Sequence, residues 1–226
     1  MSSDKKIGKN DFIEIDFTAR VKDGDIFDSN IKEDIEKSNL NAQGFVSKPF
    51  ILSVGNEMFV KGVDEFLQDK EVGDYVIELS PEKAFGVRRP SLVKIIPLRV
   101  FHEKNLNPYP GMMLNMDNII ARVLSVSGGR VTTDFNNPLA GKTVVYNIKV
   151  KRKLLDLEEK VKALIDFFFK QDFKFEINEK EKKITIEAEK QIGEFIKIFS
   201  DKFKEILGMD LEVKFKEDKN KEKKSQ

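Results

Sequence analysis

The sequence FTARVKDGDIFDS occupies residues 17–29 and joins two runs of alternating apolar residues through a tight turn. Before the turn, apolar side chains recur at every second position over residues 13–21, which is the period of a strand with one buried face. Asp23-Gly24 is typical of a hairpin turn, and Ile26 and Phe27 resume the strand. The segment therefore predicts two antiparallel strands.

Composition limits the classes of protein that this chain can belong to. It has 226 residues, 40% of them hydrophobic, and 40 Lys+Arg against 39 Asp+Glu leave a net charge of +1. This is typical of a soluble globular protein and supplies no global field for nucleic acid. Cysteine is absent, which excludes disulfides and thiolate zinc sites, and the single histidine, His102, excludes a His-rich metal site. No apolar run approaches the roughly 18 residues of a membrane span, so a cytoplasmic protein without membrane contact is predicted.

Shorter elements follow the hairpin. Residues 30–47 are polar and read as a surface loop, with a short helix expected at Lys32–Lys37. Apolar residues at 59, 60, 63, 66 and 67 have the spacing of one helical face. The further predicted elements are a strand over 48–54, a helix over 59–67, and strands over 75–79 and 143–150.

Residues 80–141 are too many for a plain connection between the last two strands, so they must contain a folded insert. Strands are expected over 92–101 and 112–116, followed by a hairpin that turns at Ser127–Arg130. We assign residues 88–133 to a small all-β insert.

The last third of the chain differs in composition. All seven prolines lie before residue 150, whereas nine of the nineteen phenylalanines follow it, which indicates a domain boundary near 150. The apolar periods predict an αββαβ unit with a helix from Leu154 to Phe168, strands over 173–177 and 184–188, a helix over 192–207 and a strand over 211–215. The charged tail, residues 217–226, is predicted to be disordered.

The segment 17–29 resembles the opening of the FKBP-type peptidyl-prolyl cis/trans isomerases, in which DG is followed by two residues and FDS. Five further blocks resemble the family's successive motifs in the same order: Lys48-Pro49-Phe50, Val54-Gly55, Val60–Val63, Val72-Gly73-Asp74 and Ser80–Gly86. Residues 134–142 look like the segment that closes the insert of SlyD-type, insert-in-flap members. The C-terminal part is similar to the extra domain of the long archaeal type.

This resemblance implies an α+β fold, with an antiparallel half-barrel sheet wrapped on one short helix. The implied domains are an isomerase domain of residues 1–87 and 134–152, an insert-in-flap chaperone domain of residues 88–133, a C-terminal α+β domain of residues 153–216, and the tail. The implied activity is isomerisation of X-Pro bonds with chaperone action, and the implied partners are unfolded or partly folded proteins.

The resemblance also implies the site, without metal or cofactor. It assigns a catalytic role to Asp28, Phe27, Phe85 and Tyr146, and substrate contacts to Phe17, Phe50, Phe59, Val60, Val63 and Leu92. An apolar pocket suits this chemistry because rotation about X-Pro makes and breaks no bond, and the twisted amide is less strongly hydrated than the planar one. From the residues alone, Phe59 could face either the core or the pocket.

The chain departs from the family at three positions of this site. Phe17 and Phe85 stand where many relatives carry tyrosine, and Val63 stands where a tryptophan is usual, so a functional but slower site is expected. One alternative is a holdase with a vestigial proline pocket. Another is a scaffolding module whose C-terminal domain binds a ribosome or oligomer partner, while specific nucleic-acid binding is not expected. Met112, Met113 and Met116 either form an adaptable client surface or fill a small core.

Overall fold

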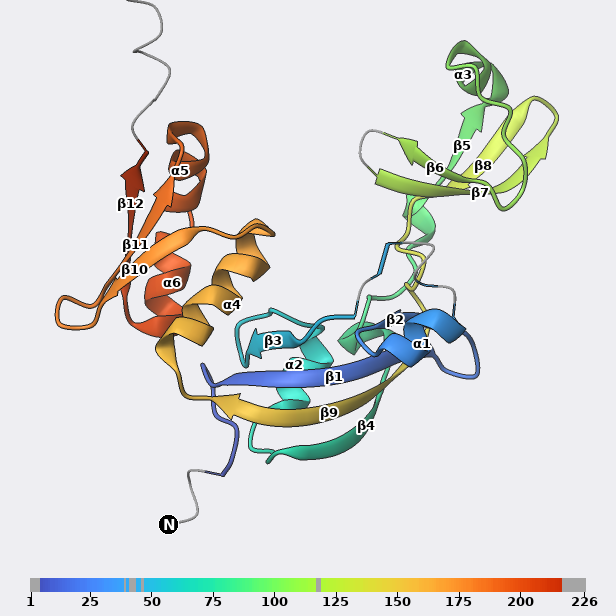
Figure 1. Ribbon diagram of the computed structural model, residues 1–226. Helices are drawn as coiled ribbons and strands as arrows, with labels where there is room; N and C mark the ends of the chain where they lie inside the picture. Colours follow the sequence, from blue (N-terminus) through green and yellow to red (C-terminus); the bar gives the residue numbers. More distant parts are fainter. Residues whose placement is uncertain (1–4, 39, 41–43, 46, 117–118, 217–226) are drawn as a thin grey trace, which may run out of the picture. The chain divides into compact units, whose positions relative to one another are not determined.

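The computed structural model describes residues 5–38, 40, 44–45, 47–116 and 119–216 (Figure 1). The chain divides into two compact units. The first contains the described residues up to Thr18, Asp28–Ile77, and the described residues from Asn147 onward; the second contains Ala19–Phe27 and Glu78–Tyr146. The domain boundaries at residues 88, 134 and 153 stay predictions.

A five-stranded sheet confirms the strands predicted before and after the insert. Its strands are β1 (Phe12–Val21), β2 (Ile26–Ser29), β3 (Phe50–Ser53), β4 (Gly73–Leu79) and β9 (Val144–Leu154). The order is β2-β1-β9-β4, and β3 pairs with β1 in an antiparallel register that sets Ile13 opposite Leu52. Ile13 and Leu52 are fully buried. The alternating apolar residues of the sequence therefore lie on the side of the sheet that faces the core.

Two short helices accompany this sheet. α1 (Lys32–Lys37) lies where it was predicted, and α2 (Lys61–Leu67) begins after Val60. Val63 is fully buried on α2. The buried Asp64 carboxylate accepts the backbone N–H groups of Gly55 at 2.8 Å and Glu57 at 3.2 Å. These bonds tie the turn after β3 to the helix.

The insert contains a separate antiparallel sheet of β5 (Val93–Pro97), β6 (Met113–Met116), β7 (Ile119–Ser127) and β8 (Arg130–Asp134). The strand order is β5-β8-β7-β6. Gly128 and Gly129 have positive φ angles of 54° and 71°, which suit the tight turn between β7 and β8. Phe101, Leu114, Val123 and Val131 form its buried core. The helical elements of this region are η2 (Pro81–Lys83), η3 (Pro90–Leu92) and α3 (Leu98–Glu103).

The prediction of an all-β insert is wrong at α3. The strand expected over residues 92–101 ends at Pro97, and a helical turn follows. Leu98 and Phe101 are three residues apart, so they lie on one face of that turn, and both pack on the insert core, with Phe101 fully buried. This packing outweighs the strand-like alternation of the sequence. His102 is exposed on α3.

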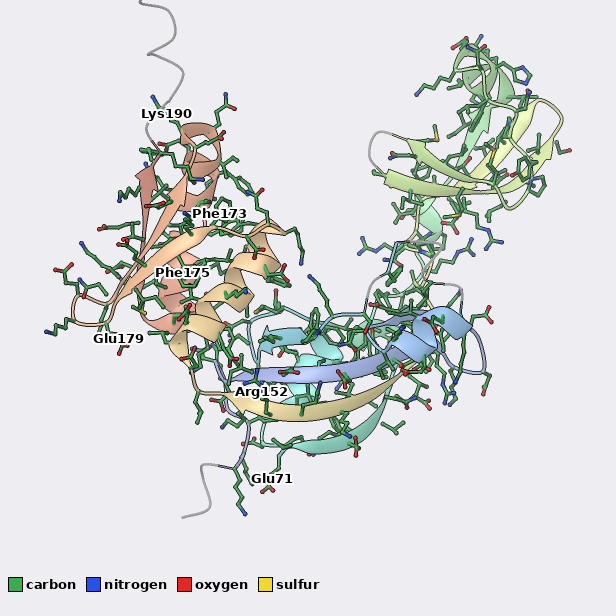
Figure 2. All side chains as sticks on the ribbon, viewed as in Figure 1. Glu71, Arg152, Phe173, Phe175, Glu179 and Lys190 are labelled. Carbon is green, nitrogen blue, oxygen red and sulfur yellow. The ribbon has the colours of Figure 1, made fainter. Side chains whose placement is uncertain are left out.

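The C-terminal elements begin with α4 (Leu157–Phe169), whose first turn is capped by the Asp156 carboxylate accepting the Glu159 N–H at 2.8 Å. The hairpin of β10 (Lys174–Asn178) and β11 (Lys183–Ala188) follows, and Figure 2 labels Phe175 on β10. β11 then pairs in parallel with β12 (Asp210–Phe215), a pairing that needs a crossover connection. That connection is formed by α5 (Lys190–Lys197) and α6 (Ser200–Leu207).

Two details of the predicted αββαβ unit are wrong. Leu154 is the last residue of β9 and does not belong to the helix. The single helix expected over 192–207 is two helices, because the chain leaves helical geometry at Phe199, with φ −90° and ψ 4°, and the Ser200 hydroxyl donates to the Lys197 carbonyl at 2.8 Å. The predicted disorder of residues 217–226 concerns a segment outside the described residues.

Candidate functional site

Three of the predicted substrate-binding aromatics lie together in the first unit. The Phe17 ring meets the Phe59 ring at 4.9 Å between centroids and the Phe50 ring at 5.7 Å, both nearly edge-on. Phe50 and Phe59 are 5.2 Å apart. Phe17 is buried, whereas Phe50 and Phe59 are half-buried. We call these residues the Phe17–Phe50–Phe59 group.

The backbone around this group is held by Asn30, which the sequence analysis did not single out. The Asn30 carboxamide oxygen accepts the Phe17 N–H at 2.7 Å, and its amide group donates to the carbonyls of Ile15 and Lys48 at 3.0 and 3.1 Å. Asn30 is buried, so these bonds satisfy its polar atoms. It thereby fixes the strand that carries Phe17 and the chain leading to Phe50. The only signal in the sequence was a polar residue directly after the FDS motif.

Asp28 is the predicted carboxylate of the site, and it is half-buried. Burial raises the pKa of Asp28, while the backbone N–H of Ser29 partly counteracts this by hydrogen bonding to the carboxylate. The Ser29 hydroxyl donates to the Phe17 carbonyl at 2.9 Å and accepts the Ile31 N–H at 3.0 Å. Asp28 is thus anchored, through its neighbour Ser29, to the strand that carries Phe17.

The two predicted valines differ in exposure. Val60 is half-buried and precedes the first turn of α2, and its carbonyl accepts the N–H groups of Val63 and Asp64 at 2.9 and 3.0 Å. Val63 is fully buried on α2, so it can support a pocket floor but presents no surface of its own.

The other four predicted site residues lie in the second unit. The Phe27 ring is edge-on to Phe85 at 5.6 Å and to Tyr146 at 6.1 Å. Tyr146 is fully buried, whereas Phe27 and Phe85 are half-buried. Leu92 is half-buried at the end of η3. Their predicted place in the proline pocket stays a prediction.

Two features are absent from the residues that the structure describes. None of the helices in these ranges is both long and apolar enough to cross a membrane. Over the same residues, no group of three or more His, Cys, Asp or Glu side chains is arranged to hold a metal ion.

Comparison with known proteins gives the family. A family model described as "FKBP-type peptidyl-prolyl cis-trans isomerase" matches residues 3–100, and one described as "FKBP26, IF domain" matches residues 94–139. The "Short-type peptidyl-prolyl cis-trans isomerase" of Methanocaldococcus jannaschii is 32% identical over 146 residues, which cover 64% of this chain and 92% of that protein. This chain belongs to the FKBP-type peptidyl-prolyl cis-trans isomerases. The resemblance carried by the FDS segment and the later blocks is thereby confirmed.

Further relatives of this FKBP-type chain are more distant. The "Probable FKBP-type 16 kDa peptidyl-prolyl cis-trans isomerase" of Pseudomonas fluorescens is 27% identical over 66% of this chain and 92% of its own length. The "FKBP-type peptidyl-prolyl cis-trans isomerase SlyD" of Helicobacter pylori is 26% identical over 56% of this chain and 63% of its own. The similarity of the C-terminal part to the extra domain of the long archaeal type and the role of residues 153–216 stay predictions.

Proposed function

We propose that this FKBP-type chain accelerates the cis/trans isomerisation of X-Pro bonds in unfolded or partly folded proteins, at a site built on the Phe17–Phe50–Phe59 group. The observation that carries the proposal is a hydrogen-bonded link between this group and a half-buried carboxylate. The Asp28 carboxylate accepts the Ser29 N–H, and the Ser29 hydroxyl donates to the Phe17 carbonyl at 2.9 Å. A proline ring is apolar, so the two half-buried aromatic side chains Phe50 and Phe59 suit it.

Isomerisation of an X-Pro bond requires neither a nucleophile nor an acid. The barrier to rotation is about 18–20 kcal/mol and arises from amide resonance, which is lost at the twisted transition state. A site that removes water from the planar amide and accommodates the twisted one lowers that barrier. The Asp28 carboxylate, whose pKa is raised by burial, would act as a fixed charge that orients the amide dipole.

The insert supplies a second part of the proposal, namely binding of unfolded client segments. Met113, Ile120 and Leu124 are exposed large apolar residues on β6 and β7. Their strand neighbours Leu114, Ala121 and Val123 are buried, so the exposed three lie on the opposite, open face of this sheet. We call Met113, Ile120 and Leu124 the insert patch.

A cavity of about 190 Å³ adjoins the insert patch and is lined by all three of its residues, by Arg122, and by the chain around Asn136. Met112 and Met116 pack against the insert core instead, so of the three insert methionines only Met113 remains exposed for clients. Because the patch and the aromatic group belong to one chain, a client segment held at the patch raises the effective concentration of its prolines at the isomerase site.

The test is acceleration of a protein refolding reaction that is limited by proline isomerisation. We expect the intact chain to accelerate refolding. The Ile120→Ser variant should accelerate refolding less than the intact chain does, while its turnover of a short proline peptide should be unchanged. Ile119→Ser is the matched control, because Ile119 is 53% exposed against 58% for Ile120 but lies outside the patch. If the chain prevents aggregation of the client but accelerates neither refolding nor peptide isomerisation, the holdase alternative replaces the isomerase proposal.

A further inference from the structure

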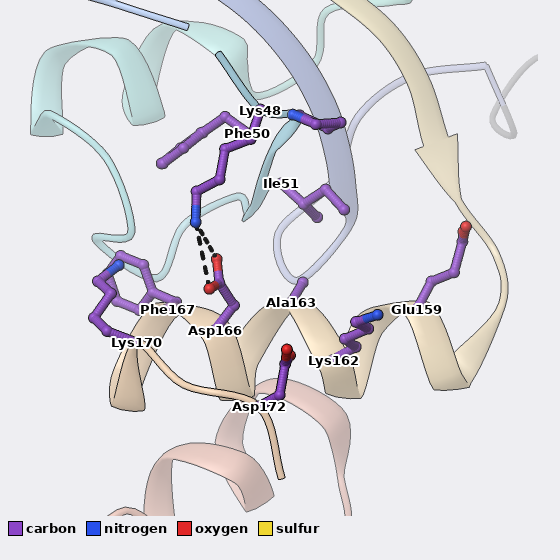
Figure 3. A pocket seen from close by; sticks show the side chains of 11 residues that line it. Lys48, Phe50, Ile51, Glu159, Lys162, Ala163, Asp166, Phe167, Lys170 and Asp172 are labelled. Carbon is purple, nitrogen blue, oxygen red and sulfur yellow. Dashed lines mark hydrogen bonds and ion pairs between the residues drawn. The ribbon is translucent and has the colours of Figure 1, made fainter. Parts of the chain in front are cut away.

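A groove lies between the chain leading into β3 and helix α4, within the first unit (Figure 3). Its volume is about 420 Å³, within the size range of ligand pockets. Pro49, Phe50, Ile51, Ala163 and Phe167 give it apolar walls. It is lined by two segments more than a hundred residues apart in the sequence, and we call it the β3–α4 groove.

The groove runs along the edge of β3. Lys48 and Pro49 line it from the chain leading into the strand, and Phe50 and Ile51 line it from the strand itself. Successive side chains of a strand point to opposite faces, so a cavity that meets both Phe50 and Ile51 lies beside the strand edge. Among the strands in the described ranges, β3 pairs with β1 alone.

The edge of β3 that faces away from β1 carries backbone N–H and C=O groups. The N–H of Val54, the residue after β3, donates at 2.9 Å to the carbonyl of Asp11, the residue before β1. By alternation, the N–H groups of residues 52 and 50 also face β1. Those of residues 51 and 53 face away, and Ser53 accordingly donates to the Met58 sulfur at 3.2 Å. The N–H and C=O of Ile51 are therefore directed away from β1, where an added extended chain could pair with them.

The groove is continuous with the proposed proline site through Phe50. Phe50 lines the groove, and its ring also contacts Phe17 at 5.7 Å and Phe59 at 5.2 Å. A polypeptide whose proline lies against the Phe17–Phe50–Phe59 group can thus place its neighbouring residues in the groove, because Phe50 belongs to both sites.

The charges around the groove are balanced, which argues against an anionic polymer as its occupant. Lys48 donates to Asp166 at 3.0 Å, as Figure 3 shows, and both side chains are more than half exposed, so this pair is easily opened. Three lysines and three acidic residues line the groove: Lys48, Lys162, Lys170, Glu159, Asp166 and Asp172.

We propose that the β3–α4 groove binds the apolar residues that flank the X-Pro bond of a client polypeptide, as an extended segment added along the edge of β3. This rests on the proposed isomerase function. It gives α4 a function, because this helix forms one wall of a client subsite, and it predicts that longer apolar peptides are better substrates than short ones.

The test uses the absence of cysteine from the chain. Lys162→Cys places one thiol on an exposed position that lines the groove, and Glu158→Cys places one on an exposed position of the same helix outside it. Each full-length variant is measured with and without a bulky environment-sensitive maleimide label. The readout is the ratio of kcat/KM for a ten-residue proline peptide, extended with leucine and valine on the amino or the carboxyl side, to that for a proline tetrapeptide.

For the unlabelled proteins we expect this ratio to exceed one for at least one of the two extended peptides. The label on the Lys162→Cys variant should lower that ratio by about tenfold, the effect of losing the burial of one apolar side chain, and the label on the Glu158→Cys variant should leave it unchanged. Equal ratios for the two labelled proteins, or no gain from peptide length in the unlabelled ones, would overturn the proposal.

Failure of the proposed function has a different signature. If the tetrapeptide is not isomerised at all, the isomerase site is refuted, and the groove is then judged by titrating the labelled Lys162→Cys variant with an extended peptide in which alanine replaces proline. A saturable fluorescence change for this variant and none for the labelled Glu158→Cys variant would still support the groove, and no change for either would refute it.

Discussion

The Phe17 and Phe59 rings form an edge-to-face pair, with their centroids 4.9 Å apart and their planes at 73°. Edge-to-face pairs contribute about 0.5–1.5 kcal/mol beyond the area that they bury, so each ring holds the other in position. Phe17 is buried in β1 and Phe59 is half-buried before α2, which makes Phe59 the member of the pair available to substrate.

Phe59→Ala should lower kcat/KM for a proline tetrapeptide by roughly tenfold to a hundredfold, because about 1.5–3 kcal/mol of apolar contact with the twisted proline is lost. A protease-coupled isomerisation assay measures this. Phe66→Ala is the control, since Phe66 is also half-buried but packs on Tyr75, at 5.8 Å. Equal losses for the two variants would remove Phe59 from the site.

Asp28→Asn should make the protein more stable and less active at neutral pH. Burial raises the pKa of Asp28, so the folded state disfavours the ionised form, and this penalty is fully present above the folded-state pKa. Below the ordinary pKa of aspartate both states are protonated and the penalty is absent. The variant's gain in the free energy of unfolding should therefore shrink as the pH falls through the raised pKa.

Urea unfolding at several pH values measures this change in stability, and the tetrapeptide assay should show a loss of roughly tenfold, corresponding to one interaction of about 1.4 kcal/mol. An Asp28→Asn variant with full activity would mean that the carboxylate plays no electrostatic role in the reaction.

Glu14→Gln should destabilise the first unit by about 1–3 kcal/mol at neutral pH, because the buried carboxylate accepts from Arg152 at 2.8 Å and pairs with Lys151 at 3.1 Å. Burial alone would raise the pKa of Glu14, but these two cations outweigh it and lower the pKa overall. The stabilisation is thus present above the ordinary pKa of glutamate and is lost as the pH falls through the lowered one.

Urea unfolding at neutral and acidic pH measures the effect of Glu14→Gln. Glu159→Gln removes another carboxylate that contacts Arg152, at 2.9 Å, but one that is more exposed, so it should cost less. A loss for Glu14→Gln that does not depend on pH would contradict this electrostatic account.

Phe101→Ala should unfold the insert and spare the rest. Phe101 is 1% exposed in the centre of the insert core, and removing such a ring costs about 3–5 kcal/mol, more than a sheet of this size is expected to tolerate. Hydrogen exchange should show loss of protection confined to β5–β8, with tetrapeptide turnover retained and acceleration of protein refolding lost. Loss of tetrapeptide turnover would mean that the insert is needed for the chemistry itself.

Much of the fold could be predicted because its signals are local. The alternation in β1 and the Gly128-Gly129 turn each specify their structure within a few residues. The helix α3 could not be predicted, because it depends on Phe101 reaching a core made by strands further along the chain. The apolar period of residues 192–207 continues across the break at Phe199, so the two helices read as one.

The same division holds for the candidate site. The order of the motifs predicted that Phe17, Phe50 and Phe59 contact substrate, and in the structure their rings pack together. Asn30 was missed because its bonds join three separate backbone segments, and no residue spacing shows that. The β3–α4 groove was missed because Lys162 and Asp166 look like an ordinary solvated helix face in the sequence.

The most direct test of the central claim is the rate at which a proline tetrapeptide converts from cis to trans, measured with the intact chain and with Phe59→Ala. The account predicts that the intact chain accelerates the conversion in proportion to its concentration and that Phe59→Ala loses most of this acceleration. An uncatalysed rate with the intact chain, or full acceleration with Phe59→Ala, would contradict it.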